Sequence, residues 1–399
     1  MLRPGSPALL VFIGGLVSMG AFSTDMFIPA MPAIRGHFAT DVATAQLTFG
    51  VFWYGFATGQ FFVGPLADRF GRRPVLAAGM ALLAVSSVAC ALAPSIGSLI
   101  AWRFIQATGV ASAWVLSRAV IRDLHTPEET TRVMGYTFAI MSVLSMAMPI
   151  SGGYLTEVAG WPWVFALPGF LGVAYVLAVL RWLPESAPER RLSLRIGAVV
   201  GNMRTLLRNR TFSGYLLCQC FTLSVAFTFL ANGSFFFVEV LSVTPTLFGV
   251  VFFAMEGALF ISSLATAPLI RRMGRRRLMA VGVCLPVVGC TSLAVLIALG
   301  SVPWPWYLLP LAVASLGVGF VMPLAQSGGL GPNPHMAGTA SSLLGVGQSL
   351  AAATFGTLAA TLFDGTAWPM VTVMTATAVV GAAIYGFVLR PVMTDPVRP

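Results

Sequence analysis

Charged side chains are scarce in this sequence of 399 residues: Asp, Glu, Lys and Arg make up only 9% of it, whereas 57% is hydrophobic. A soluble domain carries roughly 25% charged residues, so this composition excludes an ordinary soluble protein. With about 20 apolar residues for each crossing of a bilayer, the chain is long enough for about a dozen spans and short loops. The composition therefore predicts an all-α integral membrane protein.

Lysine is absent, and arginine alone supplies the basic side chains behind the net charge of +10. A basic balance can indicate a nucleic-acid partner, but these arginines lie in the short gaps between apolar runs. That distribution is typical of membrane proteins, whose cytoplasmic loops are enriched in positive charge. We therefore expect no nucleic-acid partner and a chain surrounded by a lipid bilayer.

Residues that carry metal or redox chemistry are also few. The five cysteines lie in apolar runs, and the closest two, Cys218 and Cys220, fall on different sides of a helix. The histidines, His37, His125 and His335, lie in loops without metal-ligand spacing or a neighbouring nucleophile. No nucleotide-binding P-loop is present. These absences argue against an enzyme, a metal or other cofactor, and ATP as the energy source.

Twelve apolar runs are long enough to cross a bilayer as helices. They cover residues 8–32, 44–67, 75–93, 98–120, 133–155, 162–183, 212–237, 247–270, 278–299, 306–326, 337–362 and 368–389. If the N-terminus is cytoplasmic, the arginine clusters between runs all fall inside and only Arg35 falls outside. We therefore predict both termini in the cytoplasm. The first run lacks a small-residue cleavage site and is expected to be a retained span.

The one long polar stretch, residues 184–211, lies midway along the chain. We interpret it as a cytoplasmic linker with a short interfacial helix around residues 192–207. On this interpretation, residues 1–183 form one bundle of six helices and residues 212–399 form a second, pseudo-symmetric bundle.

A turn rich in arginine follows the second run and recurs after the eighth. Residues 64–76 read GPLADRFGRRPVL, and residues 267–279 read APLIRRMGRRRLM. Pro, Leu, Arg, Gly, Arg and Arg recur in register, as the duplication of a six-helix unit in rocker-switch transporters predicts. A plain topogenic loop explains the arginines but not their shared spacing. Asp68 is replaced by Arg271 in the second copy, so the two turns differ in charge.

These motifs resemble those of a known family. Gly64, Asp68, Arg69, Gly71, Arg72 and Arg73 match the G-x-x-x-D-R-x-G-R-R signature of the major facilitator superfamily. The stretch DMFIPAMP from Asp25 is similar to the D-M-Y-L-P-A-x-P of its Bcr/CflA drug-resistance subfamily, and RFIQATG from Arg103 to the R-x-x-Q-G/A-x-G of its fourth span. The segments at 122–124, 184–186 and 335–345 are similar to further subfamily motifs, and the resemblance covers nearly the whole chain.

One motif departs from the pattern of drug exporters. Their fifth span carries G-P-x-x-G-G, whereas this chain has Met148 before Pro149, Gly152 and Gly153. The proline and the glycine pair are kept, so a flexible, closely packed helix is still expected there. We place these three residues, together with the arginine turn, in the gating machinery.

The resemblance implies proton-coupled efflux of a small amphiphilic antibiotic, such as an amphenicol, across a bacterial inner membrane. The proton gradient would supply the energy, no cofactor would be needed, and the chain would work as a monomer. Proton-coupled uptake of a nutrient on the same fold remains the alternative. A membrane enzyme or a channel fits less well, because a channel needs no duplicated gate turn.

Three charged residues inside spans stand out as candidates, since a charge there costs roughly 2.5–3.5 kcal/mol unless it is paired or hydrated. The resemblance implies that Asp25 accepts the proton, although a polar residue near the outer interface is the alternative. It also implies a proton-relay role for Arg103, which could instead be a structural hydrogen-bond hub between spans one and four. Glu256 is either a second protonatable site or a contact for a cationic substrate, or else a neutral, hydrogen-bonded acid. Arg118, near the end of its span, is expected to pair with Asp123 or Glu129.

Polar and aromatic residues within spans are candidates for the walls of a substrate cavity, because such groups adapt to varied amphiphilic ligands. The candidates are Tyr54, Gln219, Asn232, Phe236, Gln326 and Gln348. Packing is the competing explanation for each of them.

Overall fold

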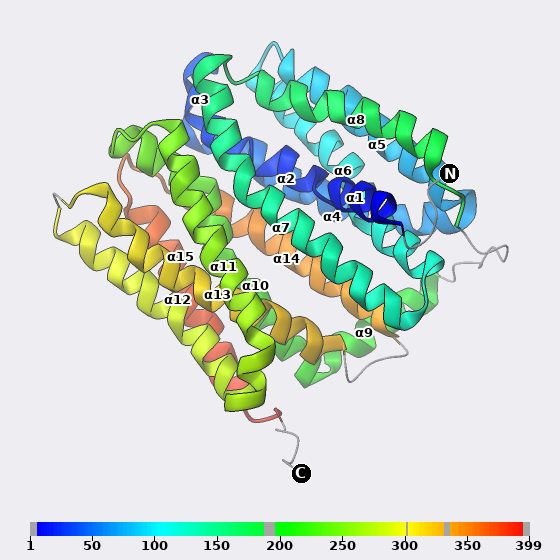
Figure 1. Cartoon of the computed structure of the whole chain (residues 1–399). Helices are drawn as coiled ribbons and strands as arrows, with labels where there is room; N and C mark the ends of the chain where they lie inside the picture. The colour runs from blue at the N-terminus through cyan, green and yellow to red at the C-terminus, as the bar shows by residue number, and fades with distance from the viewer. Residues whose placement is uncertain (1–5, 187–195, 301, 331–335, 394–399) are drawn as a thin grey trace. The chain divides into compact units, whose positions relative to one another are not determined.

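The computed structural model describes residues 6–186, 196–300, 302–330 and 336–393, and within these ranges every regular element is a helix. Most of the predicted apolar runs form one long helix each (Figure 1). In chain order these are α4 (Val42–Phe70), α5 (Arg72–Ala91), α6 (Ile96–Leu124), α7 (Pro127–Val158), α8 (Trp163–Trp182), α10 (Arg210–Phe235), α11 (Pro245–Met273), α12 (Arg275–Ala298), α13 (Leu308–Leu330), α14 (Ala337–Thr361) and α15 (Trp368–Ile384). The prediction of an all-α fold is confirmed.

The first apolar run is interrupted. It contains α1 (Pro7–Val17), α2 (Met19–Thr24), a 3-10 turn η1 (Ile28–Ala30) and α3 (Met31–Phe38). Pro29 and Pro32 contribute to the interruption, because proline has no amide hydrogen to donate to the backbone hydrogen bonds of a helix. The run therefore crosses as a broken helix, with Asp25 at the break.

Among the described residues, eleven helical segments are long and apolar enough to cross a membrane by length and composition. α4 is not among these eleven segments. It is as long as α6, at 29 residues, but it carries more threonine, glutamine and glycine than α6 does. Together with α4, these segments account for the twelve predicted runs.

Helix contacts divide the chain into two compact units. The first is Met1–Leu194 with Thr244–Val250, and the second is Arg195–Val243 with Val251–Pro399. Within the predicted linker, α9 (Ile196–Arg208) forms the short helix that the sequence indicates. Residues 187–195 lie outside the described ranges, as do residues 331–335, which include His335.

In the first unit, α4 packs along α6, and α5 packs between α6 and α8 (Figure 1). Small residues permit the close approach of α4 and α6. A Cβ added to Gly59 would lie 2.6 Å from the Cβ of Ala111, and one added to Gly55 would lie 3.1 Å from that of Ala107. Small residues at helix interfaces are the usual means of packing in membranes.

In the second unit, α10 is the central helix and packs against α13, α14 and α15. Its side chains are buried almost throughout. Two π-helical turns, η2 (Phe236–Val240) and η5 (Tyr385–Leu389), extend α10 and α15.

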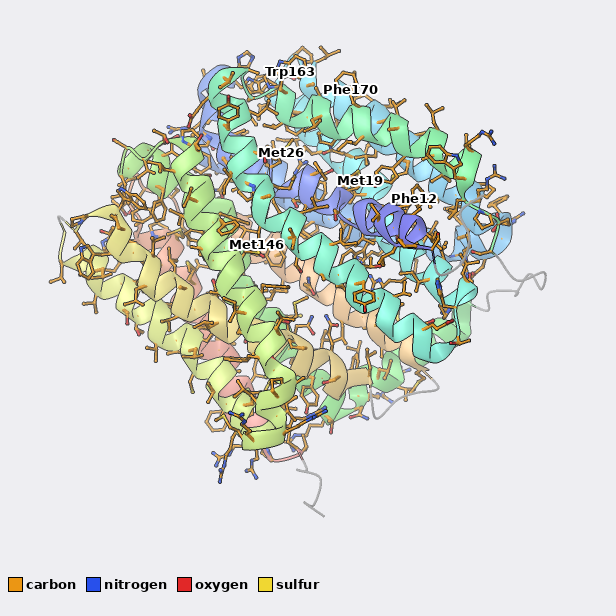
Figure 2. All side chains as sticks on the ribbon, in the orientation of Figure 1. Phe12, Met19, Met26, Met146, Trp163 and Phe170 are labelled. Carbon is orange, nitrogen blue, oxygen red and sulfur yellow. The ribbon has the colours of Figure 1, made fainter. Side chains whose placement is uncertain are left out.

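Large apolar side chains on the helices remain exposed. On α8, Trp163 is 49% exposed and Phe170 is 63% exposed, and both are labelled in Figure 2. Soluble proteins rarely leave extensive apolar surface uncovered. Lipid chains are the solvent that such a surface requires.

The first copy of the repeated turn joins α4 to α5 through Gly71. Its φ of 98° and ψ of 156° lie in a region that is essentially restricted to glycine. Glu185, which follows α8, caps the start of α5. Its carboxylate accepts hydrogen bonds from the amide nitrogens of Arg72 at 2.8 Å and Arg73 at 3.2 Å. A negative charge at a helix N-terminus is stabilising, so α5 is fixed to the end of α8.

The arginine side chains of this turn are also engaged. Arg72 Nη1 lies 2.7 Å from Asp68 Oδ1, and Arg72 Nε lies 3.3 Å from Asp123 Oδ2 at the end of α6. Arg73 donates to the carbonyl oxygen of Leu180 on α8. Four helices of the first unit are therefore held together at one end by this turn.

The second copy has the same backbone but different partners. Gly274, between α11 and α12, has a φ of 81° and a ψ of 154°. Arg275 Nη2 donates to Ser327 Oγ at 3.3 Å, and the Tyr385 hydroxyl donates to the carbonyl oxygen of Arg276 at 2.7 Å. The recurring glycine thus preserves the backbone of the turn, while the contacts described for Arg275 and Arg276 differ from those of Arg72 and Arg73.

We expect Gly71→Ala to destabilise the protein by about 1–3 kcal/mol, because alanine is strained in this backbone conformation. The new Cβ would also lie 2.6 Å from Glu185 Oε2. Thermal unfolding of the purified protein in detergent would show a lower midpoint. Gly64→Ala is the matched control, since its added Cβ meets nothing within 4 Å in a helical segment. Equal losses in both variants would contradict this account of the turn.

Candidate functional site

Asp25 lies at the break in the first span and is only 9% exposed. Its Oδ1 accepts a hydrogen bond from Thr24 Oγ1 at 2.8 Å, and its Oδ2 accepts one from Ser145 Oγ of α7 at 2.5 Å. A hydroxyl can donate to an ionised carboxylate and, after rotation, accept from the protonated acid. This environment allows the carboxyl group to gain and lose a proton while it keeps both neighbours.

Arg103, on α6, is fully buried. Its Nη1 donates to the carbonyl oxygen of Ser23 at 2.7 Å and to Gln106 Oε1 at 2.6 Å, and its Nε donates to the carbonyl oxygen of Thr48 at 3.2 Å. Three rings surround the guanidinium, with centroids 4.4 Å (Phe27), 4.3 Å (Phe52) and 5.6 Å (Phe165) from its carbon. Carbonyl dipoles and ring faces thus stabilise a charge that would otherwise be costly inside a span.

Within the described residues, the Nη2 atom of Arg103 has no hydrogen-bond partner. Arg103 reaches the first span through the carbonyl of Ser23, two residues before Asp25, and not through the carboxylate itself. Gln106 extends the network to α5, where its Nε2 donates to Ser87 Oγ at 2.7 Å. These bonds form the structural hub between spans one and four, and a proton-relay role for Arg103 stays a prediction.

The glycine pair of α7 permits close packing. A Cβ added to Gly152 would lie 2.7 Å from the carbonyl carbon of Met26, so α7 contacts the break in the first span directly. Figure 2 labels Met26, at the break, and Met146, on α7. A Cβ added to Gly153 would likewise lie 2.7 Å from the carbonyl carbon of Pro245, which the contacts assign to the same unit. Pro149 lies inside α7 without ending it.

The signature residues of the first turn fall into two groups. Asp68, Gly71, Arg72 and Arg73 form the interhelical contacts already described. Arg69 is exposed beside the Phe70 ring, 5.2 Å from its centroid, and Gly64 has open space around it.

Two of the predicted cavity residues in the second unit contact each other. Gln219 Nε2 of α10 donates to Gln348 Oε1 of α14 at 3.1 Å. Gln219 is 2% exposed and Gln348 is partly exposed. An amide pair of this kind can exchange its mutual bond for bonds to a ligand.

The other cavity candidates are dispersed. Asn232 is buried and donates to the carbonyl oxygens of Thr228 at 2.9 Å and Gly356 at 3.3 Å, so it joins α10 to α14. Phe236 is buried beside Tyr307, with ring centroids 5.4 Å apart. Gln326 is exposed, and Glu256 is partly buried in the middle of α11. In the first unit, Tyr54 of α4 is 41% exposed.

The sequence did not identify Ser145 and Glu185 as site residues. Ser145 is one of several serines in α7, and no spacing distinguishes the one that reaches Asp25. Glu185 was recognised as part of a motif, but its role as the cap of α5 depends on a contact distant in sequence.

Comparison with known proteins supports this description. The sequence pattern of the Major Facilitator Superfamily matches residues 11–356. A Bacillus subtilis (strain 168) protein described as the uncharacterized MFS-type transporter YdgK is 30% identical over 387 residues, covering 95% of this chain and 94% of that protein. A Haemophilus influenzae protein described as a bicyclomycin resistance protein homolog is 26% identical over 396 residues, covering 97% and 98%.

The fold is also found among solved structures. A bacterial homologue of the human lysosomal transporter Spinster, in an inward-facing and occupied conformation, matches with a TM-score of 0.76 at 14% identity, covering 100% of both chains. At 14% sequence identity, this structural similarity shows a shared fold and nothing about the substrate. The chain is a multi-pass membrane protein that belongs to the major facilitator superfamily, a family of transporters and not of enzymes.

Proposed function

We propose that this transporter exports a small amphiphilic antibiotic, such as an amphenicol, in exchange for protons. The observation that carries the proposal is Asp25, a carboxyl group at a break in a span that is bonded to two hydroxyls. Irregular backbone at membrane depth is characteristic of transporter sites for substrates and coupling ions. The resemblance to drug-resistance motifs, and the relative described as a bicyclomycin resistance protein homolog, support the choice of substrate class.

In the proposed cycle, Asp25 receives a proton from outside and releases it to the cytoplasm. Ser145 ties its carboxylate to α7, so the proton alters the contact between α7 and the first span. The chain acts as a monomer in the bacterial cytoplasmic (inner) membrane, with both termini inside, in keeping with the distribution of arginine. The first bundle, residues 1–183, would carry the proton chemistry and gate, and the second, beyond the linker at 184–211, would set substrate choice.

A panel of drugs, chloramphenicol among them, is tested on a pump-deficient bacterium that expresses the protein. Expression should raise resistance to chloramphenicol and lower the chloramphenicol content of the cells. Asp25→Asn should abolish both effects, because the amide cannot release a proton. Cell drug content and growth inhibition are the measurements, and membrane insertion of the variant is checked by immunoblot.

Asp41→Asn is the control for this prediction. Asp41 caps α4 from outside the helix, where hydrogen bonds from the backbone and side chain of Thr44 lower the pKa of its carboxyl group. Its replacement should leave export intact.

A rise in cell drug content on expression of the unaltered protein would instead indicate uptake. Full export by Asp25→Asn would remove Asp25 from the mechanism.

Ser145→Ala should move the pH profile of drug/proton exchange in proteoliposomes to higher pH by about one unit. The ionised Asp25 carboxylate loses a donor, so the proton is held more tightly. Ser145→Thr, which keeps the hydroxyl, should retain the normal profile. Ser151→Ala is a second control, because Ser151 is exposed on the same helix and bonds to the carbonyl of Ala147. An unchanged profile in Ser145→Ala would show that this hydroxyl does not position Asp25.

Glu256 is the proposed second protonatable group, in the unit that sets substrate choice. Glu256→Gln should lower resistance to cationic drugs of the same panel, by severalfold, and leave resistance to uncharged chloramphenicol unchanged. The reason is that an amide cannot balance a positive charge. The proposal fails for Glu256 if every drug in the panel is exported as before.

A further inference from the structure

The arginines of the second unit gather at one of its ends. Arg210, at the start of α10, donates to the carbonyl oxygen of Phe387 in η5 at 3.3 Å. The Tyr385 hydroxyl, also in η5, donates to the carbonyl oxygen of Arg276 at the start of α12, which the turn at Gly274 joins to α11. The arginines in or beside these helix ends are Arg204, Arg208, Arg210, Arg271, Arg272, Arg275, Arg276, Arg277 and Arg390.

The carboxylates in the described part of this unit, Glu239, Glu256 and Asp364, lie elsewhere. Glu239 is in η2 at the far end of α10, and Asp364 precedes α15, whose other end leads into η5. Glu256 is in the middle of α11, about 22 Å from Arg271 at the rise of about 1.5 Å for each helical residue. The positive charge at this end is therefore not balanced by acids of the described chain.

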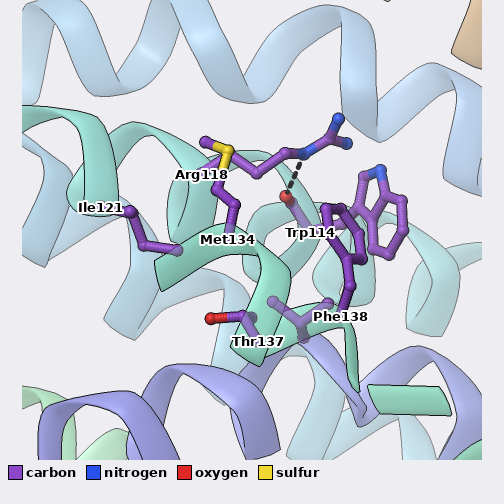
Figure 3. A pocket seen from close by; sticks show the side chains of 7 residues that line it. Trp114, Arg118, Ile121, Met134, Thr137 and Phe138 are labelled. Atoms are coloured by element: carbon purple, nitrogen blue, oxygen red, sulfur yellow. Dashed lines mark hydrogen bonds between the residues drawn. The ribbon is translucent and has the colours of Figure 1, made fainter. Parts of the chain in front are cut away.

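The arginines at the corresponding turn of the first unit are held by protein groups. Arg72 lies 3.3 Å from Asp123. Arg118 donates from Nε to the carbonyl oxygen of Trp114 at 3.2 Å, and its guanidinium carbon lies 4.6 Å from the Trp114 ring centroid (Figure 3). The predicted pairing of Arg118 with Asp123 or Glu129 is wrong, because among the described residues no carboxylate contacts it.

A proline shapes the backbone at the end of α15. In η5 the amide of Arg390 donates to the carbonyl oxygen of Tyr385, five residues earlier, at 2.7 Å. The next residue is Pro391, which has no amide hydrogen, so the Phe387 carbonyl lacks its usual helical donor four residues later. Arg210 supplies the donor instead. Such π-helical turns are rare and are frequent at functional sites.

The packing of α10 places Arg210 beside this turn. A Cβ added to Gly214, one helical turn after Arg210, would lie 3.1 Å from Leu389 Cδ1, so the start of α10 lies directly against η5. Arg210 is nevertheless exposed, and its bond to Phe387 uses only one of the several N–H donors of a guanidinium. The remaining donors can bind a further acceptor.

Phe387 and Arg390 add an apolar and a second cationic group to the same place. The Phe387 side chain is 79% exposed. Arg390, three residues later, is also exposed, and its side chain has no hydrogen-bond or ion-pair partner among the described residues. Two guanidinium groups beside an exposed ring match a ligand in which an anionic group and an apolar chain are joined.

We propose that the end of α15 binds an anionic phospholipid, with its phosphate on Arg210 and Arg390 and an acyl chain against Phe387. The planar fork of arginine matches phosphate geometry, and basic clusters beside spans attract anionic lipids. A soluble anion would leave the Phe387 ring uncovered, and a zwitterionic lipid would bring its own cation to the arginines. The site concerns the lipid around the chain and does not depend on the proposed efflux.

The test uses the full chain in detergent, titrated with phosphatidylglycerol or with phosphatidylcholine of identical acyl chains. Native mass spectrometry measures the fraction of protein that carries the first bound lipid. Phosphatidylglycerol should bind about tenfold or more tightly, because two arginines attract its net negative headgroup. Equal binding of the two lipids would overturn the proposal without the need for any variant.

Arg210→Gln and Arg390→Gln should each weaken phosphatidylglycerol binding by about fivefold and leave phosphatidylcholine binding unchanged. Arg272→Gln is the matched control, since it removes an exposed positive charge from the end of α11. It should bind phosphatidylglycerol nearly as the unaltered protein does. Equal losses in all three variants would show a diffuse attraction between charges and no site at η5. Because the Arg390 side chain bonds to no described group, its variant keeps the test decisive if Arg210→Gln lowers the unfolding midpoint without lipid.

Phe387→Ala tests the apolar part of the site. It should weaken phosphatidylglycerol binding, whereas Phe170→Ala, at a ring 63% exposed in the first unit, should not. Inorganic phosphate and polyglutamate carry negative charge without acyl chains, so neither should displace the bound lipid. Unchanged binding in Phe387→Ala, or displacement by either soluble anion, would show that the site does not recognise a phospholipid.

Discussion

The first unit depends on the burial of one positive charge, the guanidinium of Arg103. A charge inside a span costs roughly 2.5–3.5 kcal/mol unless the protein surrounds it with suitable groups. Carbonyl oxygens of two other helices, the Gln106 side chain and three phenylalanine rings supply that environment. Because these groups lie on α2, at the break that follows it, and on α4, α6 and α8, and Gln106 also reaches α5, the need to stabilise the charge fixes how five helices pack. The break in the first span, with Asp25 on it, is held by the same contacts.

The position of Asp25 follows from this arrangement. Its backbone is fixed through Ser23 on one side, and its carboxylate meets Ser145 of α7 on the other. α7 can lie so close because Gly152 has no side chain. A proton on Asp25 would therefore act at the contact between the break in the first span and α7, which contains a proline. A change in hydrogen bonding at this contact can shift the balance between two conformations. The second unit has the same turn at Gly274, where Arg271 stands in the place of Asp68, so the two copies share the backbone of the turn and differ in charge.

The sequence was sufficient to predict the elements of the fold, because apolar runs, positive loops and the repeated turn are local patterns. The break near Asp25 was not predicted, although Pro29 and Pro32 of the recognised motif lie beside it. Contacts between distant segments could not be predicted in this way. Ser145 and Glu185 carry no local pattern that names their partners, and the expected partner of Arg118 was wrong because Asp123 is held by Arg72 from another helix. Of the cavity candidates, Gln219 and Gln348 contact each other in the described part of the chain. Sequence alone cannot separate a residue that packs against a neighbouring helix from one that binds a ligand.

We propose Asp25 as the group on which the transported proton resides. Infrared difference spectroscopy of the full chain in nanodiscs, titrated with acid, tests it most directly because the carbonyl band of a protonated carboxylic acid is separate from that of a carboxylate. We expect a band that grows as the pH falls and is lost in Asp25→Asn. In Ser145→Ala the band should shift, because a hydrogen bond to the acid has changed. If the same band persists unaltered in Asp25→Asn, the transported proton does not reside on Asp25.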